Sequence, residues 1–133
     1  MLWIKTFFGI LFQTALLGVF LYLPALTLNW SDALLFLSIH FLITILASAY
    51  LLIVKPASIE ARMNYDSEAQ PKEDRLATVL MLSAIVVGLS LAPIDIFHLN
   101  LSSAFEGNIK NIGLGFYIIG MLLVMASMNA NEF

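Results

Sequence analysis

The stretch Ala33–Val54 reads ALLFLSIHFLITILASAYLLIV and contains no Asp, Glu, Lys or Arg. As a helix with a rise of about 1.5 Å per residue it would extend about 33 Å, enough to cross a hydrocarbon core of about 30 Å. Ser31-Asp32 precede it and Lys55-Pro56 follow it. These features predict a membrane-spanning helix rather than the buried helix of a soluble protein.

Three further apolar runs flank this one, at about residues 3–23, 76–92 and 109–128. The chain is therefore expected to be all-α, an integral membrane bundle of four transmembrane helices forming a single transmembrane domain over residues 1–133. The loop 55–75 separates the second and third spans. Within it, Pro56 suits a first helical position, and Ile59 and Met63 share a face four residues apart. A short helix at the membrane surface is predicted there.

The first run has an alternative interpretation as a signal peptide, with Lys5 in its basic region. Its apolar stretch is longer than the usual 7–15 residues or so, and no A-x-A-like cleavage site follows it. A retained helix is therefore the preferred interpretation.

The composition agrees with a membrane protein. The 133 residues are 61% hydrophobic and 11% charged, whereas soluble domains average about 45–50% apolar and about 25% charged residues. A net charge of −3 and a pI near 5.1 give no basic surface for nucleic acid. The chain has no cysteine, which excludes disulfides and thiolate zinc sites. We assign no catalytic, cofactor-binding or metal-ligating residue to it.

Positive charges predict the orientation in the membrane. Lys5 precedes most of the first span, and the loop 55–75 contains four of the other five Lys and Arg residues. Lys110 is the single positive residue expected at the opposite ends of the spans. Because Lys and Arg concentrate in cytoplasmic segments, both termini and the loop 55–75 are expected to be cytoplasmic in a multi-pass protein.

Four polar residues within the spans are candidates for lining a cavity. His40, Thr44 and Ser48 recur every four residues and lie on one face of the second helix, and Gln13 lies near the middle of the first. Unpaired polar groups at this depth are costly, so they should face the interior. A hydrogen bond between Gln13 and His40 is one expectation, and a polar lining for a substrate cavity is the other.

Small residues predict close helix packing. Ala84, Gly88 and Ala92 recur at four-residue spacing in the third span, and Gly113, Gly120 and Ser127 at seven-residue spacing in the fourth. Such smooth faces allow helices to approach closely in lipid. The third and fourth helices are expected to pack tightly through Gly88 and Gly120.

Other features argue against particular functions. No Asp or Glu lies in the middle of a span, which disfavours proton-exchanging exporters. Asp95 and His98 are two possible ligands where zinc requires three or four, so a solvated loop or a local capping pair is expected. The second span lacks the Arg and the Asn-x-x-x-Glu-like element of the trimeric glutathione-dependent membrane enzymes.

Two segments of the chain match the sequence elements of a known family. The first comprises Lys55-Pro56-Ala57-Ser58-Ile59-Glu60-Ala61-Arg62 with Lys72-Glu73-Asp74-Arg75-Leu76, similar to a basic-Pro element and a Lys-x-Asp-Arg-like helix start. The second comprises Asp95, the glycine-containing fourth span and Met128-Asn129-Ala130-Asn131-Glu132-Phe133. In these two segments the chain resembles the isoprenylcysteine carboxyl methyltransferase family. The resemblance covers roughly residues 51–133 and includes no catalytic motif.

The resemblance implies methyl transfer from S-adenosylmethionine to a lipophilic acceptor, with related members methylating phospholipid headgroups. The family's cofactor element, Gly-Pro-Tyr followed by Arg-His-Pro, is absent here. The expected function is therefore the membrane-embedded N-terminal part of such a protein, without its own cofactor, lining a cavity for the acceptor. It is expected to be a fragment or a relative without catalysis.

The alternative is a small four-helix membrane protein that acts as a structural or interaction subunit. The expected partners are the lipid bilayer, a lipophilic acceptor, and a C-terminal half or another copy of the chain.

Overall fold

The computed structural model describes residues 1–64, 72–101 and 108–130, and within them it is helical without a strand. The helices are α1 (Leu2–Ala25), α2 (Ser31–Val54), α3 (Pro56–Met63), α4 (Lys72–Ile94), the π-helix η1 (Asp95–Leu99) and α5 (Asn108–Ala130). Four of them are long and apolar enough to cross a membrane. The expected all-α fold with four spans, and a short helix after the second, is confirmed.

Two prolines lie inside helices, whereas the sequence pattern placed helix ends just before them. Pro24 belongs to the last turn of α1, and Pro93 is buried near the end of α4, which continues directly into η1. A proline has no backbone N–H and therefore removes one helical hydrogen bond. Only one residue of α1 follows Pro24, and only one residue of α4 follows Pro93 before η1 begins, so little regular α-helix lies beyond either proline. The helices consequently extend a few residues beyond the expected boundaries.

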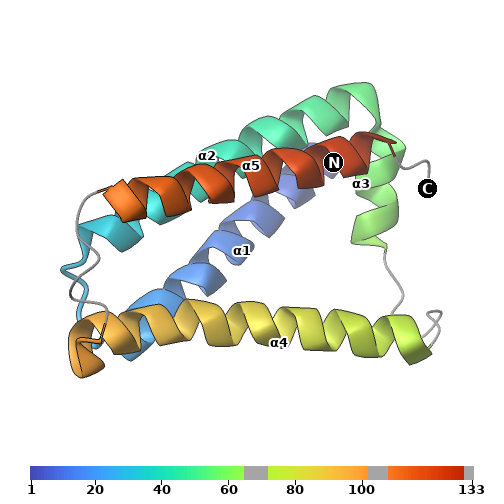
Figure 1. Cartoon of the computed structure of the whole chain (residues 1–133). Helices are drawn as coiled ribbons and strands as arrows, with labels where there is room; N and C mark the ends of the chain where they lie inside the picture. Colours follow the sequence, from blue (N-terminus) through green and yellow to red (C-terminus); the bar gives the residue numbers. More distant parts are fainter. Residues whose placement is uncertain (65–71, 102–107, 131–133) are drawn as a thin grey trace.

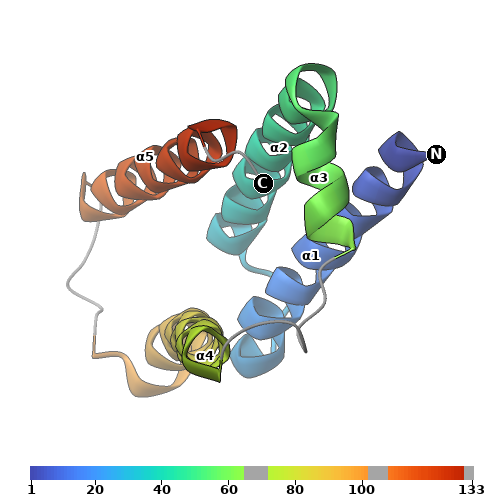
Figure 2. The same cartoon turned by 90° about the vertical axis from the view of Figure 1, so that its right-hand side faces the viewer.

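The long helices form an open arrangement rather than a closed bundle. α1 packs against both α2 and α4, while α5 runs beside α2 with few close backbone approaches. Figure 2 shows α5, α2, α1 and α4 following one another around the molecule, with α3 across one end. Figure 1 shows the same succession from the side, with α4 opposite α2 and α5.

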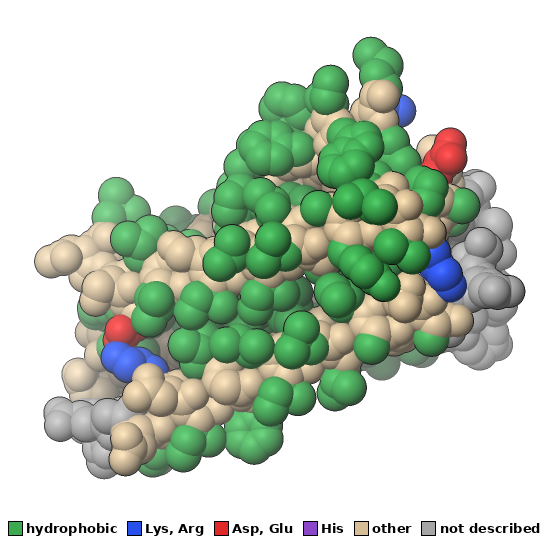
Figure 3. All heavy atoms as spheres, turned by 90° about the horizontal axis from the view of Figure 1, so that it is seen from above, with side chains coloured by type: hydrophobic (Ala, Val, Ile, Leu, Met, Phe, Trp, Pro, Cys, Tyr) green, Lys and Arg blue, Asp and Glu red, His purple; other side chains and the backbone are tan. Residues whose placement is uncertain are grey.

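Most large hydrophobic side chains face outward, as a lipid environment requires. They cover the middle of the face in Figure 3, and the charged side chains visible there lie toward the ends of the helices. The buried core cluster is small and consists of Leu51, Leu52 and Ile59, with Leu2 and Met128 packed against it. This cluster fixes α3 against the end of α2.

The expected packing of the third and fourth spans through their glycines is wrong. A Cβ atom added at Gly88, Gly113 or Gly120 would meet nothing within 4 Å, and α4 and α5 do not form a packed pair. Among the glycines in the described segments, Gly18 is the one that approaches a neighbour, since a Cβ there would lie 3.5 Å from Leu37 Cδ1. Close approach therefore occurs between α1 and α2, because a smooth face does not specify which helix will cover it.

Candidate functional site

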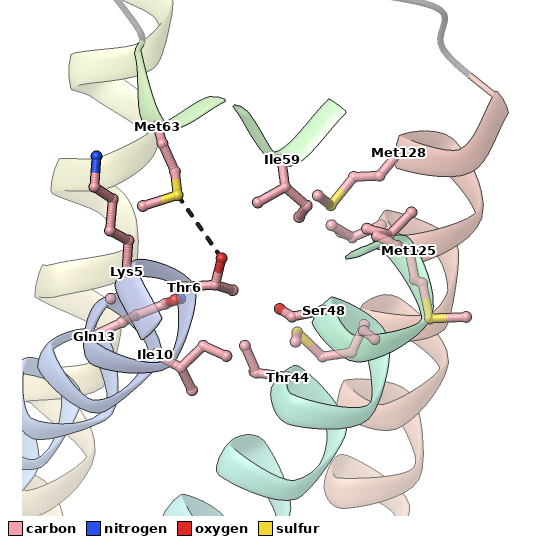
Figure 4. A pocket seen from close by; sticks show the side chains of 15 residues that line it. Lys5, Thr6, Ile10, Gln13, Thr44, Ser48, Ile59, Met63, Met125 and Met128 are labelled. Carbon is pink, nitrogen blue, oxygen red and sulfur yellow. Dashed lines mark hydrogen bonds between the residues drawn. The ribbon is translucent and has the colours of Figure 1, made fainter. Parts of the chain in front are cut away.

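A cavity of about 430 Å³ lies among α1, α2, α3 and α5, near the end at which α3 crosses the molecule. We call it the methionine-lined cavity because four of its lining residues are Met63, Met121, Met125 and Met128. Figure 4 shows side chains from all four helices around the same space, with Ile59 and Met63 of α3 at its top. The buried cluster of Leu51, Leu52 and Ile59 thus also holds α3 in place beside the cavity.

The wall formed by α1 and α2 carries the polar groups. Helical spacing brings Thr6 and Gln13, two turns apart on α1, and Thr44 and Ser48, one turn apart on α2, to the lining. Lys5 lies at the edge of the cavity. The opposite wall, from α3 and α5, contributes thioether and aliphatic side chains. The cavity therefore has a polar wall and an apolar wall, and none of the described residues that line it is a carboxylate.

Hydrogen bonds within the polar wall are mostly local. The Thr44 hydroxyl donates to the carbonyl oxygen of His40 at 2.7 Å, and the Thr6 hydroxyl donates to the carbonyl oxygen of Leu2 at 3.0 Å. Thr6 Oγ1 also lies 3.8 Å from the sulfur of Met63, a contact between α1 and α3 drawn in Figure 4. Because both threonines bond to their own helices, their remaining lone pairs are available as acceptors for a ligand.

The structure brings together three of the four residues expected to line a cavity. Gln13, Thr44 and Ser48 line the methionine-lined cavity, whereas His40 does not. His40 is buried, with 3% of its surface exposed, and its Nδ1 shares a hydrogen bond with the hydroxyl of Tyr117 on α5. The expected pairing of Gln13 with His40 is therefore replaced by a bond between His40 and Tyr117.

Sequence reasoning missed Tyr117 and the methionines. Tyr117 carries a hydroxyl into the middle of a span, and such a group needs a partner in the same way as His40. Met121, Met125 and Met128 follow one another at four- and three-residue spacing, which places them on one face of α5. The spacing predicts a common face but gives no information about what that face covers.

At the opposite end of the helices, polar and aromatic contacts connect η1 to α1 and to the start of α2. Asp95 accepts a hydrogen bond from the backbone N–H of Leu101 at 2.8 Å, so of the two residues considered as a capping pair it is Asp95 that caps the end of η1. His98 Nε2 lies 2.8 Å from the carbonyl oxygen of Pro24 and thereby joins η1 to α1. The Trp30 ring contacts the Phe97 ring edge to face at 5.3 Å between centroids.

No protein-family model, no curated protein and no solved structure matches the chain.

Proposed function

We propose that this chain is a membrane module that binds a lipophilic molecule in the methionine-lined cavity. The observation that carries the proposal is the two-sided lining, with thioether and aliphatic groups opposite Gln13, Thr44 and Ser48. Its volume of about 430 Å³ lies within the roughly 300–1,000 Å³ typical of small-molecule sites. Methionine side chains are flexible and polarizable, so they adapt to ligands of irregular shape.

The resemblance of residues 51–133 to isoprenylcysteine carboxyl methyltransferases supports a more specific version of this function. On that basis the ligand is the lipophilic acceptor of a methyl group from S-adenosylmethionine. The polar wall would face the end of the acceptor that reacts, and the methionines would contact its chain. The methyl donor would be held by residues outside this sequence, because the family's cofactor motif, Gly-Pro-Tyr followed by Arg-His-Pro, is absent from it.

We further propose that α3 and both ends of the chain face the cytoplasm. Lys5 and Lys55 lie at the end of the molecule that carries α3, and Arg62, Lys72 and Arg75 belong to the same end by their places in α3 and α4. The opposite end has Lys110, which forms an ion pair with Asp32 at 2.8 Å. The excess of positive charge beside α3 supports the cytoplasmic assignment.

Single-cysteine labelling tests this orientation. The native chain has no cysteine, so Glu60→Cys on α3 and Leu28→Cys between α1 and α2 each introduce a unique, exposed thiol. In intact cells we expect a membrane-impermeant maleimide to label the Leu28 variant and not the Glu60 variant. Both variants should react after the cells are permeabilised. The reverse pattern in intact cells would overturn the orientation.

Photocrosslinking tests ligand binding. With the protein in lipid nanodiscs, a palmitic acid analogue carrying a diazirine on its chain should label Met125 and Met128 in a saturable manner. Excess unlabelled palmitic acid should compete with this labelling. Labelling of the outward-facing Leu123 on the same helix should not saturate, because that residue contacts bulk lipid.

A matched pair of glycine variants locates the binding in the cavity. Gly9 lines the cavity and Gly88 lies on α4 away from it, and a Cβ at either position would meet nothing within 4 Å. Gly9→Phe should reduce the saturable labelling several-fold by filling the cavity, whereas Gly88→Phe should leave it unchanged. Equal labelling of both variants and the native chain would contradict the proposal.

The second candidate function is a structural or interaction subunit. It is favoured by α5, which buries none of its described residues and makes few close backbone approaches to α2. Because α5 has few contacts with the other described helices, its surface is available to bind a second copy of the chain or a C-terminal half. This function predicts a stable oligomer in nanodiscs together with an absence of saturable palmitate labelling.

A further inference from the structure

Two cavities adjoin one ion pair at the end of the molecule opposite α3, where α2 and α5 begin and α4 ends (Figure 1). Lys110 Nζ on α5 lies 2.8 Å from Asp32 Oδ1 on α2, and each side chain is about half exposed. Both residues line a cavity of about 270 Å³ and also a cavity of about 280 Å³, and Phe36 is common to the two linings. We call the first the α2–α5 cavity and the second the α4-side cavity.

The α2–α5 cavity extends from the ion pair toward the middle of the membrane. Asp32 and Lys110 lie in the first turn of α2 and of α5. The lining on α5 continues through Gly113 and Leu114 to Tyr117. At the rise of an α-helix, the distance from Lys110 to Tyr117 is about 10 Å along the axis. The charged groups therefore lie at the outer end of the cavity and the apolar groups lie deeper.

The α4-side cavity is lined by residues from both sides of the open arrangement. Leu89 and Ala92 of α4 and Ile96 of η1 contribute to its lining, together with Leu21 of α1. Among the described residues that line either cavity, the ion pair is the charged part, and the others are aliphatic, aromatic or glycine. Each cavity therefore offers an apolar space that begins at the same pair of charges.

Trp30 indicates the depth of the ion pair in the membrane. It directly precedes α2 and lines the α4-side cavity. Its ring contacts Phe97 of η1 and Tyr22 of α1 edge to face, at 5.3 and 6.3 Å between centroids. Tryptophan and tyrosine concentrate at the level of the lipid headgroups. Asp32, two residues after Trp30, is thus expected at headgroup level, with both cavities extending toward the lipid chains.

The charges of the ion pair favour a ligand that carries both signs. An anion bound at Lys110 would be repelled by the Asp32 carboxylate beside it, and a cation bound at Asp32 would be repelled by Lys110. In a zwitterion laid antiparallel to the pair, each charge has opposite charges as its neighbours. The ammonium group has three N–H donors and the carboxylate has about four lone-pair sites, so their mutual bond leaves groups free for a ligand.

We propose that the Asp32–Lys110 ion pair binds the headgroup of a phosphatidylethanolamine molecule in the leaflet opposite α3, with the upper part of one acyl chain in each cavity. The lipid phosphate accepts a hydrogen bond from Lys110, and its primary ammonium donates to Asp32. Both bonds are charge-assisted. The lipid thereby connects α5 to α2 and α4, which α5 itself approaches closely at few points or not at all. This site is separate from the methionine-lined cavity and does not depend on a ligand there.

Native mass spectrometry of the full chain tests the choice of lipid. The protein is purified in detergent and incubated with phosphatidylethanolamine, phosphatidylglycerol or phosphatidylcholine carrying the same two chains. We expect one phosphatidylethanolamine per chain, bound at a fraction several-fold above that of the other two lipids. Phosphatidylglycerol is anionic, and the choline group has no N–H to donate to Asp32. Equal binding of either lipid would overturn the proposal, as would the absence of a bound phosphatidylethanolamine.

Variants of the ion pair test its role in binding. Lys110→Gln removes the ammonium group and should lower the bound fraction of phosphatidylethanolamine several-fold, whereas Lys110→Arg keeps the charge and should largely restore it. Arg75→Gln removes a positive charge near the start of α4, at the opposite end, and should leave binding unchanged. Variants are compared after elution as the same species in size-exclusion chromatography. Undiminished binding by a folded Lys110→Gln variant would overturn the proposal.

A matched pair of glycines on α5 tests the position of one acyl chain. Gly113 lines the α2–α5 cavity, whereas Gly115 is not part of that lining, and a Cβ at either position would meet nothing within 4 Å. Gly113→Phe should fill the cavity and reduce binding several-fold, and Gly115→Phe should not. A lysophosphatidylethanolamine, which has one chain, should bind several-fold less than the two-chain lipid. Native binding by a folded Gly113→Phe variant would contradict the placement of a chain in this cavity.

Discussion

Replacing Leu51 with alanine is expected to lower the free energy of unfolding by about 2–5 kcal/mol, the range for truncating a fully buried leucine. Leu51 is 1% exposed and belongs to the cluster that holds α3 against α2, with Leu52 and Ile59. It also lines the methionine-lined cavity. Truncation should therefore loosen α3 as well as destabilise the chain. The measurement is unfolding by SDS in mixed micelles, followed by near-ultraviolet circular dichroism.

The matched control is Leu46→Ala on the same helix. Leu46 is 60% exposed and contacts no core cluster of the described residues. Its truncation should change the free energy of unfolding by about 0.5 kcal/mol or less, as expected for surface positions. If the Leu46 variant lost as much stability as the Leu51 variant, the assignment of the buried core to the α2–α3 junction would be wrong.

Gly18→Leu is expected to destabilise the chain by about 1–3 kcal/mol, the usual cost of overpacking a close contact. A Cβ at Gly18 would already be in van der Waals contact with Leu37 Cδ1 at 3.5 Å, so the additional leucine atoms must displace that side chain. Gly18→Ala should be tolerated, because the single methyl group fits at that distance. The same SDS unfolding assay measures both variants.

Gly120→Leu provides the comparison, since a Cβ there would meet nothing within 4 Å. We expect little change in its stability, in contrast to the sequence-based expectation that Gly120 is a packing site. A large loss in the Gly120 variant with none in the Gly18 variant would reverse the placement of close helix contacts. The comparison therefore tests the observed order of helices directly.

The candidate site was predictable to the extent that it depends on one helix. His40, Thr44 and Ser48 were expected on one face of α2 because four-residue spacing fixes a common face. Spacing could not separate His40, which lies against Tyr117, from Thr44 and Ser48, which line the cavity. That separation depends on which residue of α5 lies opposite each turn of α2.

The sequence alone determined the four apolar helices and the short helix α3, since hydropathy, length and helical spacing are properties of each segment. Only the tertiary structure decided that α1 packs against α2 and α4, and that His40 pairs with Tyr117 rather than Gln13. The physical reason is that lipid tails are as apolar as leucine, so the hydrophobic effect does not choose among helix partners in a membrane. Packing shape and hydrogen bonds make that choice, and both depend on residues far apart in the chain.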